Sequence, residues 1–358
     1  MMPMVAASSG DRLPAFQSCL SQCVSNRCTP DSPPLDAMLR LFRWSCRGDC
    51  AYHCTHSVTS GLLLLASSSA SSPSARPVVH QFYGKWPFWR LAGIQEPASV
   101  LFSLGNAWVH YKGLRKVRTR IKNGTGVHLK GWVMALAIVQ MNTWFWSAVF
   151  HTRDTPFTEK MDYFSATATI MCTLLYTLVR TFHLFPQQPD RPRGAPSLYP
   201  LIIVFLIAYF SHVSYLLSGP RFDYGWNVLF NLIMGATHLI LWSLFSLSFS
   251  IRLPWPLSRI PTPYPPLDPL TITPKPPWSG RSAVLVMATT AAMSLELFDF
   301  PPFHRIIDAH SLWHLATILI ARGWYGFLIR DVAMLEAVRT GMSGTKATEA
   351  VVFQSSNK

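Results

Sequence analysis

The sequence predicts an all-α membrane protein, a seven-transmembrane helix bundle with a small lumenal Cys-rich segment at its N-terminus. Of its 358 residues, 49% are hydrophobic and only 13% are charged, about half the charged fraction that is usual in soluble domains. The charged residues leave long apolar stretches between them, which is typical of multi-span membrane proteins. Six of the seven cysteines lie in the first 54 residues, outside these stretches.

The N-terminal segment, residues 1–80, is polar and rich in cysteine. An even number of clustered cysteines is typical of disulfide-stapled segments in an oxidising compartment. A cytosolic zinc module is the alternative, but the spacings of three and four intervening residues differ from the CxxC pattern of common zinc knuckles. We therefore expect three disulfides, with the connectivity left open by the sequence. The cysteines concerned are Cys19, Cys23, Cys28, Cys46, Cys50 and Cys54.

Seven apolar stretches follow, and most approach the ~20 residues that a bilayer-spanning helix needs. We expect these spans at 96–111, 131–151, 162–183, 198–217, 225–250, 282–298 and 311–330. Residues 81–95, just before the first span, mix Trp and Phe with Lys85 and Arg90. That mixture favours the membrane–water interface, and a surface that stacks nucleic-acid bases is the alternative.

The distribution of positive charge predicts the topology. Residues 112–130 contain seven Lys and Arg and no acidic residue, and the 184–197 and 252–281 loops are also basic. The positive-inside rule places these loops in the cytosol, together with the C-terminal tail, residues 331–358, and places the N-terminus in the lumen. Residues 1–18 lack the apolar core of a signal peptide, so either the start is incomplete or the first span exports the N-terminus. The net charge of +14 thus indicates topology and anionic lipid, with no nucleic-acid partner.

Two motifs far apart in the chain share one spacing. Ser147 and His151 form an SxxxH motif, and His310 and His314 form an HxxxH motif. Residues four apart share a helix face, so two imidazoles at this spacing can hold one metal ion with a third imidazole from elsewhere. The predicted topology brings both motifs, and Asp162 at the start of the third span, to the lumenal boundary. Ionisable groups at membrane depth are costly and usually functional, so we predict a hydrolytic metal site here.

Three runs of sequence resemble one family closely: residues 81–99, 144–166 and 308–314. They are similar to the PER-like family of proteins that remodel lipids after GPI attachment. That family belongs to the superfamily of alkaline ceramidases and progestin/adiponectin-type receptors. The superfamily pattern of SxxxH, a following Asp and a terminal HxxxH is matched by Ser147, His151, Asp162, His310 and His314.

The resemblance covers roughly residues 81–331 and implies a hydrolase-like seven-span domain over 96–330. It implies a GPI-specific phospholipase A2 that removes the sn-2 acyl chain from the glycerolipid of GPI-anchored proteins. The expected location is the endoplasmic reticulum membrane, with the Golgi membrane as the alternative. Glu96 and Asn106 also match family residues, and we expect capping or polar packing for both. Asp308 either supports His310 or is solvated.

The residue chemistry agrees with a zinc-dependent hydrolysis. Three imidazoles, those of His151, His310 and His314, would hold Zn²⁺ with a position open to water, whose pKa the metal lowers to about 7. Asp162 would accept the proton of this water and orient it. Ser147 would donate a hydrogen bond to the developing oxyanion.

Two other functions remain as alternatives. A metal-free serine lipase would use Ser147 as its nucleophile, but this leaves two histidines without a role. A non-catalytic zinc-binding membrane receptor or chaperone would use the histidines structurally. Analysis of bound metal in the purified protein distinguishes the serine lipase from the zinc enzyme. Measurement of released fatty acid distinguishes the receptor or chaperone from an enzyme.

Overall fold

The computed structural model describes residues 8–68, 78–121, 129–185, 195–265, 275–339, 342, 348, 349 and 351. Within these ranges the chain forms ten α-helices and one short 3-10 helix, and its β-structure is limited to isolated bridges. The predicted all-α class is therefore confirmed. Of the tail predicted at residues 331–358, residues 331–339 continue the last helix, and most of the others lie outside the described residues.

The chain divides into two compact units. The first unit comprises Met1–Phe102, Ser147–Glu159 and Leu295–Trp313, and the second comprises Ser103–Trp146, Lys160–Ser294 and His314–Lys358. The boundaries fall inside five helices. Each of these five helices therefore contributes residues to both units. The last of them is α10 (Ala309–Arg339).

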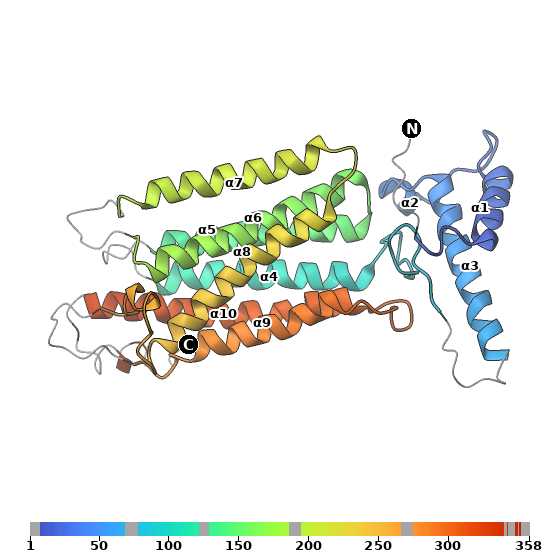
Figure 1. The fold of residues 1–358 in the computed structure, drawn as a ribbon. Helices are drawn as coiled ribbons and strands as arrows, with labels where there is room; N and C mark the ends of the chain where they lie inside the picture. Colours follow the sequence, from blue (N-terminus) through green and yellow to red (C-terminus); the bar gives the residue numbers. More distant parts are fainter. Residues whose placement is uncertain are drawn as a thin grey trace. The chain divides into compact units, whose positions relative to one another are not determined.

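Three disulfides staple the Cys-rich part of the first unit, which confirms their prediction. Helix α1 (Pro14–Arg27) packs against α3 (Cys46–Ser68), and the short α2 (Ala37–Leu41) precedes α3 (Figure 1). The cysteine spacing places the sulfurs of each helix on one face, and the pairs run in opposite order along the two helices. The bonds join Cys19 to Cys54, Cys23 to Cys50 and Cys28 to Cys46.

The segment before α4 folds onto these helices. Two tight turns, closed by the bridges Phe82–Lys85 and Leu91–Ile94, shape it. Arg90 lies between the rings of Trp44 and Tyr52, 3.4 and 3.8 Å from their centroids, and pairs with Asp49 at 3.0 Å. The guanidinium of Arg90 is thus enclosed by aromatic and acidic partners within the first unit.

Seven long helices coincide with the seven predicted apolar stretches. Within the second unit they lie alongside one another (Figure 1). They are α4 (Pro97–Arg120), α5 (Leu129–Thr152), α6 (Pro156–Thr181), α7 (Leu198–Ser218), α8 (Tyr224–Leu247), α9 (Arg281–Leu297) and α10, with the 3-10 helix η1 (Leu257–Arg259) between α8 and α9.

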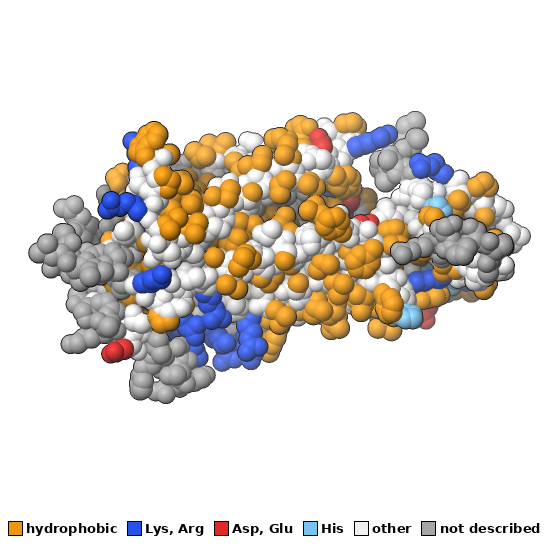
Figure 2. Space-filling model, turned by 60° about the horizontal axis from the view of Figure 1, so that its bottom comes forward, with side chains coloured by type: hydrophobic (Ala, Val, Ile, Leu, Met, Phe, Trp, Pro, Cys, Tyr) orange, Lys and Arg blue, Asp and Glu red, His pale blue; other side chains and the backbone are white. Residues whose placement is uncertain are grey.

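Four of these helices, α5, α7, α8 and α10, are long and apolar enough to cross a membrane. The chain is therefore a multi-pass membrane protein, and Figure 2 shows hydrophobic side chains spread along the helices with few charged ones among them. Length and composition do not support the predicted count of seven spans. The last turns of α4 are basic, α6 carries several charged residues, and α9 has 17 residues.

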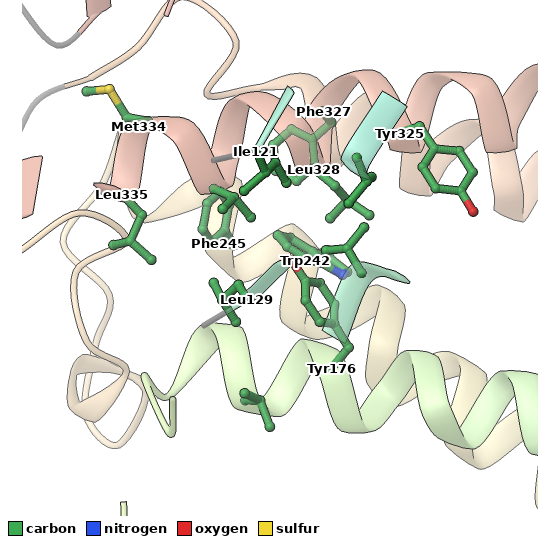
Figure 3. Close-up of a cluster of buried hydrophobic side chains, with 14 of the residues drawn as sticks. Ile121, Leu129, Tyr176, Trp242, Phe245, Tyr325, Phe327, Leu328, Met334 and Leu335 are labelled. Atoms are coloured by element: carbon green, nitrogen blue, oxygen red, sulfur yellow. The ribbon is translucent and has the colours of Figure 1, made fainter. Parts of the chain in front are cut away.

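The core of the second unit is built around Trp242 of α8, which is 1% exposed. Its ring meets Phe327 of α10 edge to face, with 5.2 Å between the centroids. Tyr176 of α6 and Phe245 of α8 lie in the same cluster (Figure 3). Aromatic rings in such contacts contribute beyond their buried area.

A fully buried ion pair closes one end of this core. Arg180 of α6 donates two hydrogen bonds of 2.7 Å to Asp331 of α10. It also donates to the carbonyl oxygen of Pro263 at 3.0 Å, and the Tyr264 hydroxyl donates to Asp331 at 2.9 Å. Removing one member of such a pair typically costs about 3–5 kcal/mol. The pair therefore fastens the loop at residues 263–264 to both helices.

Candidate metal centre

Two histidines from distant parts of the chain face each other in the first unit. His151 lies at the end of α5 and is 2% exposed, and His310 lies in the first turn of α10. Their Nε2 atoms are 3.3 Å apart. The Nδ1 atom of His151 lies 2.8 Å from Glu96, and that of His310 lies 2.7 Å from Glu296.

This arrangement fixes the tautomers of both rings. Because a carboxylate only accepts hydrogen bonds, each Nδ1 carries the proton and donates it. In neutral imidazoles, both Nε2 atoms then present lone pairs to each other, which repel unless a cation or a shared proton lies between them. Two nitrogens bound 2.0–2.1 Å from one tetrahedral zinc ion would be about 3.3–3.4 Å apart. The observed separation fits shared coordination.

His314 follows His310 by one turn of α10, on the same face of that helix. Within the second unit, its Nδ1 lies 3.0 Å from the Ser103 hydroxyl, and its backbone carbonyl accepts a 2.7 Å hydrogen bond from Asn106. The Ser103 contact involves Nδ1, the ring nitrogen that the carboxylates hold in the other two histidines. His151, His310 and His314 thus form a group that could hold one metal ion.

Glu96 connects His151 to a partly buried lysine. The Lys85 ammonium bonds to the other carboxylate oxygen of Glu96 and lies 3.4 Å from Asp154. Burial alone would raise the pKa of Glu96, but Lys85 and His151 hold that pKa well below its ordinary value. Burial would lower the pKa of Lys85, yet Glu96 and Asp154 raise it. Glu96 is therefore an anion that can orient the His151 ring.

The two predicted catalytic side chains belong to different units. Ser147 is buried one turn before His151 on α5, so the two residues share a helix face. Asp162 lies in the second turn of α6, in the second unit, where its backbone carbonyl accepts a hydrogen bond from Ser165. The roles of Ser147 and Asp162 remain predictions.

Sequence reasoning missed the carboxylates and the lysine that support the histidines. Glu96 was expected to cap a helix or to pack against polar groups, and its polar partners are His151 and Lys85. Glu296 is an acidic residue near the end of an apolar helix, a signal that could have marked it. Residues 81–95 were interpreted as an interfacial segment, and this interpretation did not predict that Lys85 is partly buried and pairs with Glu96.

Asp308 corrects another expectation. It is 5% exposed, so the alternative of a solvated carboxylate is wrong. Its side chain accepts a 2.8 Å hydrogen bond from the Ser311 backbone, and the Ser311 hydroxyl in turn accepts one from the Asp308 backbone at 3.0 Å. This reciprocal capping starts α10 just before His310.

Two histidines outside the SxxxH and HxxxH motifs have polar partners in the second unit. His212 lies 3.2 Å from the Asn227 carbonyl oxygen, and His238 lies 2.7 Å from the Thr177 hydroxyl. The contact of His212 joins α7 to α8, and that of His238 joins α8 to α6. Neither histidine belongs to the metal-binding group.

The fold and the histidines define a multi-pass helical membrane protein with a candidate metal centre and a disulfide-stapled N-terminal segment. The chain belongs to the Per1-like family, whose model matches residues 36–332. It is 37% identical to the "Protein PER1 homolog" of Schizosaccharomyces pombe, over 91% of this chain and 88% of the relative.

Animal relatives match over a similar length. The chain is 35% identical to the zebrafish (Danio rerio) "GPI-specific phospholipase A2-like PGAP3", over 95% of each chain. It is also 35% identical to the Drosophila melanogaster "Post-GPI attachment to proteins factor 3", over 89% of this chain and 87% of the relative. No solved structure matches the chain.

Proposed function

We propose that this protein remodels GPI anchors by hydrolysing the sn-2 acyl ester of the anchor's glycerolipid. One structural observation supports this proposal above the others. The Nε2 atoms of His151 and His310 face each other at 3.3 Å while carboxylates hold both Nδ1 atoms, an arrangement that suits two ligands of one metal ion. The relatives named as GPI-specific phospholipase A2-like proteins direct the proposal to the GPI lipid.

Zinc fits this donor set best, because imidazoles suit it and three protein ligands are usual at catalytic zinc. When bound, the ion supplies Lewis acidity and lowers the pKa of water to about 7. His151, His310 and His314 would hold it, with Glu96 and Glu296 orienting two of the rings. Asp162 would take up the proton that the attacking water releases, and Ser147 would donate to the ester oxygen as negative charge develops.

We further propose that all seven long helices span the membrane. Polar side chains lower the hydropathy of α4 and α6, but several of them bond to neighbouring helices within the second unit. Thr143 of α5 meets Thr169 of α6 at 2.8 Å, and His110 of α4 meets Tyr325 of α10 at 2.9 Å. Polar groups satisfied between helices are compatible with a spanning position.

In this topology the N-terminus is lumenal and the C-terminus is cytosolic. The disulfides are consistent with a lumenal N-terminal segment. The guanidinium groups of Arg120, Arg281 and Arg330 lie near one another, so positive charge gathers within the second unit on the side expected to face anionic cytosolic lipid.

The topology leads to a direct expectation for inserted glycosylation acceptors. An acceptor placed between Thr152 and Pro156 should be glycosylated in cells, because that loop would be lumenal. The same acceptor placed after Arg120 should stay unmodified, because the basic segment there resists translocation. Glycosylation at the second position but not at the first would contradict the proposed orientation.

The lipid composition of GPI anchors tests the proposed activity. In cells lacking this protein, GPI-anchored proteins should keep the sn-2 acyl chain that remodelling normally replaces. Mass spectrometry of the anchors measures this change, and wild-type protein should reverse it. We expect the protein in the endoplasmic reticulum membrane, with the Golgi as the alternative, and imaging in the same cells distinguishes the two.

The second candidate function is a non-catalytic receptor or chaperone that binds zinc structurally. If purified protein holds zinc but releases no fatty acid from a GPI substrate, and anchors from deficient cells are unchanged, this candidate replaces the enzyme. The pair of histidines held by carboxylates is compatible with this second candidate, because a structural metal also benefits from oriented ligands.

A further inference from the structure

The first unit contains a groove that the proposed chemistry does not use. Its volume is about 320 Å³, at the lower end of the range for small-ligand sites. Three parts of the chain form it: α3, the segment before α4 and the turn before α10. The lining residues are Thr59, Leu63, Val79, Pro87, Trp89, Pro302, His304 and Arg305.

An exposed tryptophan lines the groove, and a buried histidine stacks against its ring. The Trp89 side chain is 45% exposed, and its ring stacks on His56, with the centroids 4.0 Å apart and the planes 9° from parallel. His56 is 6% exposed, and burial lowers its pKa to about 4. His56 is therefore neutral at pH 7 and forms an uncharged support for the indole.

The hydrogen bonds of His56 fix its tautomer and hold an arginine. Its Nε2 lies 3.0 Å from the Phe88 carbonyl, which can only accept, so Nε2 carries the proton. The other nitrogen, Nδ1, then accepts from the Arg305 guanidinium at 2.9 Å. Arg305 also donates to the Ser60 hydroxyl at 3.0 Å, and its guanidinium lies 5.0 Å from the centre of the Trp89 ring.

Arg305 lacks a counter-ion among the residues that the structure describes, because none of the ion pairs found there includes it. A guanidinium has five N–H donors, and the contacts to His56 and Ser60 use two of them. Both His304 and Arg305 adopt positive φ, 51° and 60°, in the turn closed by the Phe303–Ile307 bridge. Non-glycine residues in this conformation are strained and cluster at ligand sites.

We propose that this groove binds the phosphorylated glycan of the GPI substrate, with a sugar ring on Trp89 and a phosphate on Arg305. The inference rests on the proposed function, because a GPI anchor joins its lipid to a glycan that carries phosphate. Aromatic faces suit the apolar faces of sugars, and guanidinium groups bind phosphate in bidentate fashion.

Only a short segment of chain joins the groove to the pair of histidines, His151 and His310. His310 follows Arg305 by five residues in the chain, and both belong to the first unit. Within that unit, Trp86 donates a 2.7 Å hydrogen bond to Asp299, and the Trp89 backbone donates to the Arg305 carbonyl at 2.9 Å. These contacts fasten the turn that leads into α10 to the segment that carries Trp89.

Isothermal titration of the purified full-length protein with a soluble probe tests the inference. The probe is a GPI phosphoglycan from which base treatment has removed both acyl chains, so that metal-centre chemistry cannot act on it. Wild-type protein should bind this probe and should bind the enzymatically dephosphorylated glycan at least about tenfold more weakly, since one charge-assisted contact is lost. Equal affinity for the two glycans would overturn the assignment of Arg305 to phosphate.

Variants localise the binding. Arg305→Gln should weaken it at least about tenfold, Arg305→Lys should weaken it less because the charge remains, and Trp89→Leu should weaken binding of both glycans. Arg40→Gln is the matched control, since Arg40 is an exposed arginine on α2. Wild-type affinity in Arg305→Gln and Trp89→Leu would overturn the proposal, as would an equal loss in Arg40→Gln. Thermal unfolding and free-thiol counts verify that each variant is folded.

Two further measurements distinguish glycan binding in the groove from binding of membrane headgroups and from the proposed hydrolysis. Nanodiscs of phosphatidylinositol should not compete with the probe; full competition would assign the groove to membrane headgroups instead. His310→Ala should bind the probe like wild type, because that residue is not in the groove. Glycan binding without any acyl release would leave the inference standing and refute the proposed hydrolysis, whereas acyl release unaffected by the groove variants would do the reverse.

Discussion

Replacing His310 with alanine is expected to remove the bound metal and ester hydrolysis together. The change deletes one of the two imidazoles whose Nε2 atoms face each other at 3.3 Å, and no other described side chain stands in the same position. The loss should exceed the 10–100-fold that removal of a ligand's hydrogen-bonding partner typically costs. Elemental analysis of purified protein and fatty-acid release from a GPI substrate measure the two effects.

Changing a carboxylate that bonds to a histidine should weaken metal binding less than removing the histidine itself. Glu296→Gln keeps the size of the side chain but makes it a poorer partner for His310 Nδ1, so we expect metal affinity to fall about 10–100-fold. His212→Ala is the control, because that buried histidine bonds to Asn227 and lies outside the metal-binding group. Stoichiometric zinc retained in His310→Ala would remove this residue from the ligand set.

His151→Ala and His314→Ala should give the same double loss if all three imidazoles are ligands. The reason is that a three-ligand site reduced to two ligands no longer fixes the geometry of the ion. Loss of activity with full metal content in His314→Ala would instead indicate a site held by His151 and His310 with another ligand.

Ser147→Ala is expected to lower the hydrolysis rate by about 10²–10³-fold while leaving the metal in place. This is the usual effect of losing one donor to an oxyanion, and a neutral serine is not an expected zinc ligand. Asp162→Asn should also keep the metal and should be more damaging, because an amide cannot accept the proton of the attacking water. Steady-state rates and metal content of the same preparations measure both effects.

The same pair of variants separates the metal mechanism from the serine alternative. With zinc-assisted attack, no acyl group should become attached to Ser147, and mass spectrometry of protein trapped during turnover should find it unmodified. An acyl group on Ser147 would establish the nucleophilic mechanism instead. Ser243→Ala on α8 is the control, since its hydroxyl donates to the Leu239 backbone carbonyl in its own helix.

Local patterns in the sequence determined the helices and the residues that can share a face. Apolar runs predicted the positions of α4 to α10, because helix formation depends on residues close together in the chain. The same periodicity related His310 to His314 and Ser147 to His151. The same patterns did not determine the number of membrane spans, because only α5, α7, α8 and α10 among the described helices are long and apolar enough to cross a membrane.

Tertiary structure alone decided which of these faces meet. His151 and His310 are 159 residues apart, and their spacing in the sequence contains no information about the facing Nε2 atoms. Glu96 and Glu296 reach the Nδ1 atoms of His151 and His310 only because long-range packing brings the segment before α4 to the end of α5, and the end of α9 to the start of α10. The disulfide pairing and the contact of His56 with Arg305 likewise depend on long-range packing, which side-chain type and local spacing do not specify.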